Sequence, residues 1–190
     1  MKSLCVYCLL EVATSGSNVK DGLKPRRASS RLEAYRLNLR VMTPTHPPAP
    51  SEKTLRLDAQ ALSAFLDSAF PAATRPTFGD VVSVAPRHVR MVLNPGPESI
   101  RPGNIVSGPT LMGFADVAAF AVVLAHIGPV GMTVTNTLTI TFLRACRLER
   151  VIADARLLKL GRRLATVEVR MWQEAEDRPV AHATIGYAIP

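Results

Sequence analysis

Apolar residues recur at regular spacing from residue 58 onward and predict a domain that contains both helices and strands. The first predicted helix begins after Asp58, a good N-cap residue, and ends at Pro71. Its apolar positions follow a helical period: Leu62, Phe65, Leu66, Ala69 and Phe70. A strand-like run from residue 80 to 93 follows, in which Pro86 marks an edge or a bulge.

A second, longer helix is predicted over residues 109–127, which are apolar almost all round. Pro109 suits the first helical position and Gly128 suits the C-cap. Asp116 and His126 interrupt the apolar stretch, which argues against a membrane span. We therefore expect a buried helix, with His126 as a cation that complements the helix dipole in its last turn.

Strict alternation over residues 133–143 predicts a half-buried strand. One face holds Val134, Leu138, Ile140 and Phe142, and the other holds Thr133, Thr135, Thr137, Thr139 and Thr141. Three more strands are predicted over residues 151–160, 164–173 and 180–189, and their short turns indicate an antiparallel meander. Such a meander buries the apolar helix only if it curls around it. We therefore expect an α+β fold, an antiparallel sheet wrapped around one long central helix.

The composition limits the choice of partners. The chain has 190 residues, of which 47% are hydrophobic, enough for one full-sized domain. Its net charge is +8, but residues 1–41 hold eight of the 23 Lys and Arg residues and three of the 15 Asp and Glu residues. The remainder is nearly balanced and lacks interleaved aromatic residues, so we expect no nucleic-acid partner.

The first forty residues show no sustained helical or strand period, and a Pro-rich segment begins at Met42. We expect a disordered basic leader over residues 1–57 and a folded domain over residues 58–190. Cys5 and Cys8 have metal-ligand spacing but lack a second pair, so no metal is expected. Three cysteines in all, an odd number, favour a reducing compartment, the cytoplasm. A secretory signal and translation from Met42 remain alternative explanations of the leader.

Asp116 is the main candidate for chemistry, because GxSxG, HExxH, GxGxxG and P-loop motifs are absent from the sequence. A carboxylate in an apolar helix is costly to bury unless it is paired or faces water. A structural ion pair and a catalytic role in a cleft both explain it, and the sequence leaves both open.

Residues 107–116, SGPTLMGFAD, resemble the start of the central helix in the hotdog-fold acyl-CoA thioesterases, most closely the PaaI-like, phenylacetic-acid-degradation branch. That pattern is His-Gly-Gly with an Asp eight residues after the first Gly, then a strand ending like residues 140–144 and a turn like Gly161-Arg162. The resemblance covers roughly residues 75–190 and agrees with the predicted order of elements. It implies hydrolysis of an acyl-CoA to a free acid and CoA without a metal or other cofactor.

The resemblance also implies two catalytic roles. The Gly108 amide would polarise the thioester carbonyl, and Asp116 would act as general base or nucleophile, roles that suit a helix N-terminus and a carboxylate. Eight residues of helix separate the two by about 12 Å, so one carbonyl cannot touch both. Two antiparallel helices across a two-fold axis would join Gly108 of one subunit to Asp116 of the other. We therefore expect a homodimer, or a dimer of dimers, with composite sites.

Three positions depart from the family pattern: Ser107 replaces the His, Pro109 replaces the second Gly, and Arg101 stands where an Asn is common. Pro109 lacks an N–H that would assist the oxyanion. Thr135 matches a hydroxyl that orients the nucleophilic water in relatives, although the alternation places it on the threonine face of an ordinary strand.

Basic residues near strand ends and a turn are candidates for binding the phosphates of CoA, although solvated turn residues explain them equally well. They are Arg144, Lys159, Arg162 and Arg163.

Three other functions remain open. The same fold serves for hydration of an enoyl-CoA, which in relatives uses an Asp with a nearby His, or for binding an acyl thioester without turnover. The basic leader could instead bind nucleic acid. The acyl group is undetermined between aromatic and medium aliphatic acids, because residues of two chains would line its pocket.

Overall fold

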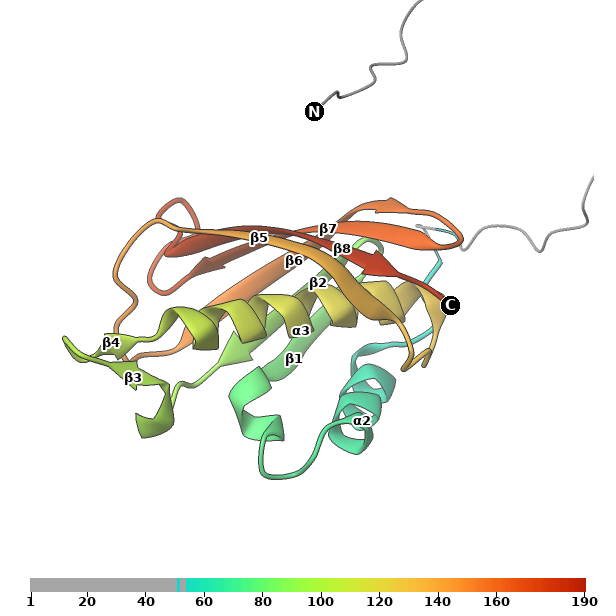
Figure 1. The fold of residues 1–190 in the computed structure, drawn as a ribbon. Helices are drawn as coiled ribbons and strands as arrows, with labels where there is room; N and C mark the ends of the chain where they lie inside the picture. The colour runs from blue at the N-terminus through green and yellow to red at the C-terminus, as the bar shows by residue number, and fades with distance from the viewer. Residues whose placement is uncertain (1–50, 52–53) are drawn as a thin grey trace, which may run out of the picture. The chain divides into compact units, whose positions relative to one another are not determined.

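The long helix α3 (Gly108–Ile127) lies against one face of a six-stranded antiparallel sheet (Figure 1). The computed structural model describes residues 51 and 54–190. The strands are β1 (Asp80–Ala85), β2 (His88–Leu93), β5 (Val134–Phe142), β6 (Val151–Leu160), β7 (Leu164–Trp172) and β8 (Ala181–Ala188), in the spatial order β1-β2-β6-β7-β8-β5. The predicted α+β fold with a central helix is confirmed.

Smaller elements lie beside this core. Helix α2 (Ala59–Ala69) begins at Asp58, whose side chain accepts a hydrogen bond from the Ala61 N–H at 2.8 Å, as the sequence predicts. Two short 3-10 helices, η1 (Arg75–Phe78) and η2 (Pro97–Ser99), and the two-stranded sheet of β3 (Ile100–Arg101) and β4 (Ile105–Val106) complete the described elements.

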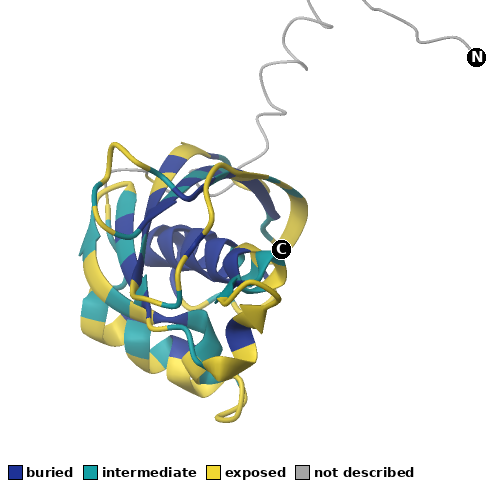
Figure 2. Cartoon of the chain, turned by 90° about the vertical axis from the view of Figure 1, so that its left-hand side faces the viewer, coloured by how far each residue is buried: buried dark blue, intermediate teal, exposed yellow. Residues whose placement is uncertain are grey.

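Helix α3 supplies the centre of the hydrophobic core. Every residue from Val117 to Ile127 is buried, and Figure 2 shows this helix surrounded by the rest of the domain. Each fully buried Val or Leu side chain stabilises the fold by about 1.5–3 kcal/mol. In the described part of the chain, α3 alone is long and apolar enough to cross a membrane, but 78% of its most apolar window is buried in the domain.

The ends of α3 are capped as predicted. Ser107 is the N-cap, and its hydroxyl accepts from the Thr110 N–H. Gly128 follows the last turn with φ +91°, a conformation that glycine adopts without a steric penalty, and its N–H donates to the Leu124 carbonyl at 2.8 Å.

The run from residue 80 to 93 is a hairpin rather than one strand. Pro86 and Arg87 form its turn, with Arg87 at φ +63°. The buried His126 holds this turn, because its Nε2 accepts from the Arg87 N–H at 2.9 Å and its Nδ1 donates to the Val122 carbonyl at 2.8 Å. A backbone N–H can only donate, so His126 is uncharged, and the prediction that it complements the dipole as a cation is wrong.

The predicted meander is correct for β6, β7 and β8, but β5 does not pair with β6. It pairs with β8 at the edge of the sheet, and residues 143–150 carry the chain across to β6, which lies between β2 and β7. This placement sets β5 beside the last strand, and both strands contribute to the candidate site.

The folded domain includes residues before the predicted boundary at 58. The Arg56 and Leu57 N–H groups donate to the Ala125 carbonyl at 2.7 and 3.2 Å, and Leu55 packs against the core. Cys5, Cys8 and nearly all of the predicted leader lie outside the described residues.

A buried acid ties β2 to β6 on the sheet face opposite α3. Asp154 is 1% exposed, and its Oδ1 accepts from His88 Nε2 at 2.5 Å and Arg90 Nε at 3.0 Å. Arg156 donates to Oδ2 at 3.2 Å. Burial alone would raise the pKa of Asp154, but these three hydrogen bonds outweigh it and lower the pKa below its ordinary value.

Asp154→Asn should lower the free energy of unfolding at pH 7 by about 1–3 kcal/mol, because charged hydrogen bonds are lost. A carboxyl whose pKa is lowered by folding stabilises the fold at neutral pH and loses that contribution as the pH falls below about 4. The stability difference between the wild type and Asp154→Asn should therefore shrink in acid, as urea unfolding at pH 7, 4 and 3 would show. The exposed Asp177→Asn is the matched control, and a difference independent of pH would contradict the assignment.

Candidate active site

Asp116 lies in the middle of α3, half-buried, with its carboxylate held by two hydroxyl groups from the sheet. Its Oδ1 accepts from Thr135 Oγ1 at 2.7 Å and lies 2.7 Å from the Tyr187 hydroxyl. The Tyr187 hydroxyl is also 2.8 Å from the Asp116 carbonyl, so its single proton serves two acceptors of the same residue. Among the described residues none donates to Oδ2, which leaves this oxygen for a water or a substrate.

Asp116 is not part of a structural ion pair. No Lys, Arg or His of the described residues forms a salt bridge with it, and its side-chain partners are neutral. Between the two explanations that the sequence leaves open, the geometry therefore favours a carboxylate in a cleft.

Thr135 reaches Asp116 because β5 carries a bulge. Thr135 pairs with Tyr187 and Thr137 pairs with Gly186, so Asn136 is an extra residue between them. Residues directly opposite each other in an antiparallel pair share a face, and Thr135 therefore lies on the same side as Tyr187. The alternation predicted Thr135 on the threonine face, and for this residue that prediction is wrong.

Gly186 provides the space for the bulge. A Cβ built at Gly186 would lie 2.4 Å from Asn136 Oδ1 and 2.5 Å from Thr137 Oγ1. Any larger residue would push these side chains away from β8. The absence of a side chain at Gly186 thus leaves room for the bulged residue next to β8.

Tyr187 is a residue of the candidate site that the sequence does not single out. The side chain is buried, and its ring stacks against Phe120 with centroids 6.0 Å apart. Burial, and next the Asp116 carboxylate, raise the pKa of the Tyr187 hydroxyl far above its ordinary value. The hydroxyl is therefore protonated at neutral pH and acts as a hydrogen-bond donor.

A cavity of about 380 Å³ opens beside Asp116. Its walls are largely apolar and include three phenylalanines, Phe70, Phe78 and Phe120. The Phe70 and Phe78 rings pack with centroids 4.7 Å apart. The volume and the apolar lining with one carboxylate are typical of a site for a small organic group.

Gly108 is the first residue of α3, and no acceptor among the described residues takes its N–H. A Cβ at Gly108 would meet the Phe142 ring at 3.3 Å, so glycine lets this ring approach the start of the helix. The helix is unbroken from Gly108 through Asp116, so within one chain the two are about 12 Å apart. Of the residues that depart from the family pattern, Ser107 caps the helix and Arg101 lies exposed on β3.

The four basic residues predicted to hold phosphates do not form one cluster. Arg144 follows β5 near the start of β8, where its Nη1 donates to the Pro179 carbonyl at 2.7 Å. Lys159, Arg162 and Arg163 lie at the β6–β7 turn, where Leu164 pairs with Ala188 near the other end of β8. Strands of eight or nine residues span about 26–30 Å, so a single chain cannot bring all four to one phosphate.

The topology, with an antiparallel sheet packed on one long central helix, is that of the hotdog fold. A candidate thioesterase from Silicibacter sp. TM1040 is 35% identical to this chain, with a TM-score of 0.65 over 74% of this chain and 96% of its own. Zebrafish thioesterase superfamily member 2 is 18% identical, with a TM-score of 0.63 over 70% of this chain and 99% of its own. A phenylacetic-acid-degradation-related candidate thioesterase from Ralstonia eutropha JMP134 is 21% identical, with a TM-score of 0.59 over 66% and 98%.

Residues 103–180 match the thioesterase superfamily, and this segment includes Gly108, Asp116 and Thr135. A search of the curated proteins gave no match. Together with the 35% identical relative, the match shows that the chain belongs to the thioesterase superfamily. The family expected from residues 107–116 is thereby confirmed, and membership supports thioesterase activity.

Tyr187→Phe should lower kcat for thioester hydrolysis about ten-fold with little change in KM, because one hydrogen bond that holds the Asp116 carboxylate is lost. Steady-state thiol release would measure both constants. Phe keeps the ring that packs on Phe120, so thermal melting should change by only a few degrees. An unchanged kcat would show that Thr135 alone is sufficient to orient Asp116.

Proposed function

We propose that this protein is an acyl-CoA thioesterase that hydrolyses its substrate to a free acid and CoA. The observation that carries the proposal is the Asp116 carboxylate, fixed at Oδ1 by two hydroxyls and free at Oδ2 beside an apolar cavity. A carboxylate held in this way is oriented to accept a proton from water, while the cavity holds the acyl group.

The proposed reaction uses Asp116 as a general base. Its Oδ2 removes a proton from a water molecule as the water oxygen attacks the thioester carbonyl carbon. The Gly108 N–H donates to the oxygen on which negative charge develops, helped by the positive end of the helix dipole. The C–S bond then breaks, the proton passes to the leaving sulfur, and the acid and CoA are released. Thr135 and Tyr187 keep the carboxylate in place throughout. Direct attack by Asp116 as a nucleophile would use the same oxygen.

A composite site requires a second subunit, and we propose that the two subunits meet along strand β5. This strand is at the edge of the sheet, where its outer backbone groups lack a strand partner among the described residues. Apolar side chains at its ends are about half exposed: Val134 at 52%, Phe142 at 49% and Leu143 at 46%. Pairing of two such edges would join the sheets and let Gly108 of one chain meet Asp116 of the other.

The described histidines give no support to hydration of an enoyl-CoA, which in relatives needs a His beside the Asp. His88 and His182 bond to Asp154 and Glu168 on the outer face of the sheet. His126 uses both ring nitrogens in the core. Hydrolysis is therefore the reaction that the site supports best.

Asp116→Asn should lower the rate of thiol release by about 10²–10⁴-fold, because the amide cannot take a proton from water. The thiol assay should use acyl-CoAs of several chain lengths and aromatic types. The exposed Asp80→Asn is the matched control and should keep full turnover. Full activity of Asp116→Asn would exclude this mechanism, and saturable binding without turnover in the wild type would indicate a binding protein instead.

Mixing two inactive variants tests the composite site. Gly108→Pro removes the N–H and suits the backbone, because Ser107 has φ −72° and ψ 150°, as a residue before proline requires. Its Cβ would lie 3.3 Å from the Phe142 ring, so Gly108→Ala, which adds the same Cβ and keeps the N–H, is the steric control. If each site takes Gly108 from one chain and Asp116 from the other, an equal refolded mixture of Gly108→Pro and Asp116→Asn should recover about a quarter of wild-type activity through heterodimers.

The control for this complementation is each variant refolded alone, which should remain inactive. Native mass spectrometry should show that heterodimers form in the mixture. If they form and the activity stays far below a quarter of the wild-type value, Gly108 and Asp116 of the same chain would act together.

A further inference from the structure

The apolar cavity beside Asp116 has one wall that comes from outside the central helix and the edge of the sheet. This wall consists of Ala69 and Phe70 at the end of α2 and Phe78 at the end of η1. Helix α2 lies on the side of α3 that faces away from β7 and β8 (Figure 1). The other lining residues belong to α3, to β5 with the loop before it, and to β8. A change in the α2–η1 wall therefore alters the size of the cavity and leaves the hydrogen bonds of Asp116 intact.

A row of aromatic rings leads from the carboxylate to this wall. The Tyr187 ring, whose hydroxyl bonds to Asp116, stacks on Phe120 with centroids 6.0 Å apart. Phe120 meets Phe70 edge-on at 6.4 Å, and Phe70 packs on Phe78 at 4.7 Å. Phe70 and Phe78 thus come last in the row. An acyl group whose carbonyl lies beside the carboxylate and whose chain enters the cavity extends along Phe120 toward these two rings.

The wall is held in place by an arginine and a glycine. The Arg75 side chain is 12% exposed, and its Nε donates to Asp67 Oδ1 at 2.8 Å while its Nη1 donates to the Gly79 carbonyl at 2.6 Å. Gly79 has φ +73°, and a Cβ at this position would lie 2.6 Å from the Phe114 ring, so the close turn from η1 into β1 requires glycine. These contacts join α2, η1 and the start of β1, and the wall is therefore a fixed limit of the cavity.

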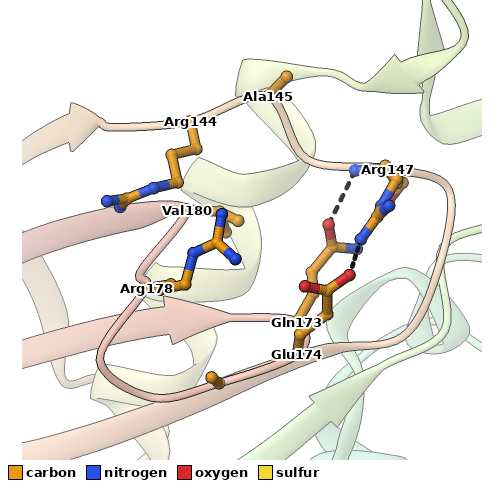
Figure 3. A pocket seen from close by; sticks show the side chains of 8 residues that line it. Arg144, Ala145, Arg147, Gln173, Glu174, Arg178 and Val180 are labelled. Carbon is orange, nitrogen blue, oxygen red and sulfur yellow. Dashed lines mark hydrogen bonds and ion pairs between the residues drawn. The ribbon is translucent and has the colours of Figure 1, made fainter.

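A second cavity does not suit an acyl group. It has a volume of about 530 Å³, lies between the segment after β5 and the loop from β7 to β8, and is lined largely by charged and amide side chains (Figure 3). Arg147 forms an ion pair with Glu174 there, and Arg144 donates to the Pro179 carbonyl at 2.7 Å. An acyl chain in this cavity would displace water from charged groups without replacing its hydrogen bonds. The apolar cavity at Asp116 is therefore the place for the acyl group.

We infer that Phe70 and Phe78 are specificity-determining residues that set the greatest length of the acyl group. The inference rests on the proposed function for the nature of the ligand. Each methylene group that the cavity removes from water raises the affinity about four-fold. Affinity rises with chain length until the chain reaches the two rings. It then levels off or falls, because further carbons must remain in water or push the rings apart.

Calorimetric titration of the full chain with S-(2-oxoalkyl)-CoA thioethers of stepwise increasing chain length tests this limit. These analogues keep the carbonyl but are not hydrolysed, because a methylene group separates it from the sulfur. Phe70→Ala should move the length at which affinity stops rising by about two to four carbons toward longer chains, since the surroundings fill the space of the lost ring only in part. Phe78→Ala should move it in the same direction. Phe70→Trp, with a larger ring, should move it toward shorter chains.

The opposite shifts of Phe70→Ala and Phe70→Trp separate a change in the cavity from a loss of stability, which would have one sign. Phe65→Ala is the matched control, because it removes the same ring from the same helix and Phe65 lies outside the lining of the cavity. It should keep the wild-type limit. Phe70→Leu keeps more of the packing than Phe70→Ala and should still move the limit toward longer chains, so the test does not depend on folding of the alanine variant.

Two results would overturn the inference: the same limit in the wild type and in the Phe70 and Phe78 variants, or a wild-type affinity that does not depend on chain length. Thiol release from the corresponding acyl-CoAs tests the proposed function separately. Turnover with an unmoved limit would retain the thioesterase and remove the role of the two rings. A limit that moves as expected without turnover would retain the role of the rings and remove the hydrolase.

Discussion

The fold depends on covering a helix that is apolar around its whole circumference. A helix with one apolar stripe needs one packing surface, but α3 is buried on every side from Val117 to Ile127. The sheet supplies most of the cover, and η1 and α2 also contact the helix. Once α3 is enclosed, the places where it can carry out chemistry are few. They are its N-terminus, where the Gly108 N–H has no acceptor in the described part of the chain, and the half-buried turn that carries Asp116.

The side-chain partners of Asp116 are neutral hydroxyl groups rather than basic groups. A buried basic partner would form an ion pair and make the carboxylate a structural element. Neutral donors orient the carboxylate and leave its charge available, since Tyr187 and Thr135 each donate a hydrogen bond to it but supply no positive charge. The raised pKa of Tyr187 keeps this donor protonated. The arrangement stabilises one orientation of the Asp116 carboxylate.

The sequence predicted the elements well, and the pairing between them poorly. The all-round apolar pattern of residues 109–127 defines a buried helix whatever surrounds it, and Pro109 and Gly128 mark its ends, so that prediction was confirmed. The register between strands cannot be predicted in this way, because an alternating pattern assumes a strand without a bulge. The bulge at Asn136 depends on Gly186, 50 residues later, and no local pattern shows that the two lie side by side. Tyr187 was missed for the same reason, since its role exists only once β8 pairs with β5.

The same argument explains why the four basic residues expected at the phosphates are separated within one chain. Arg144 and Lys159 are 15 residues apart in the chain, but β6 runs the length of the sheet between them and carries Lys159 to the far end. On the proposed function, this arrangement divides the substrate between subunits. One chain would offer the Gly108 amide, and its partner would offer Asp116 with an apolar cavity. The scissile bond would then lie at the boundary between the two subunits. Changes in the apolar cavity of one chain would alter the preference for the acyl group, and recognition of the thiol half, which the other chain provides, would be unchanged.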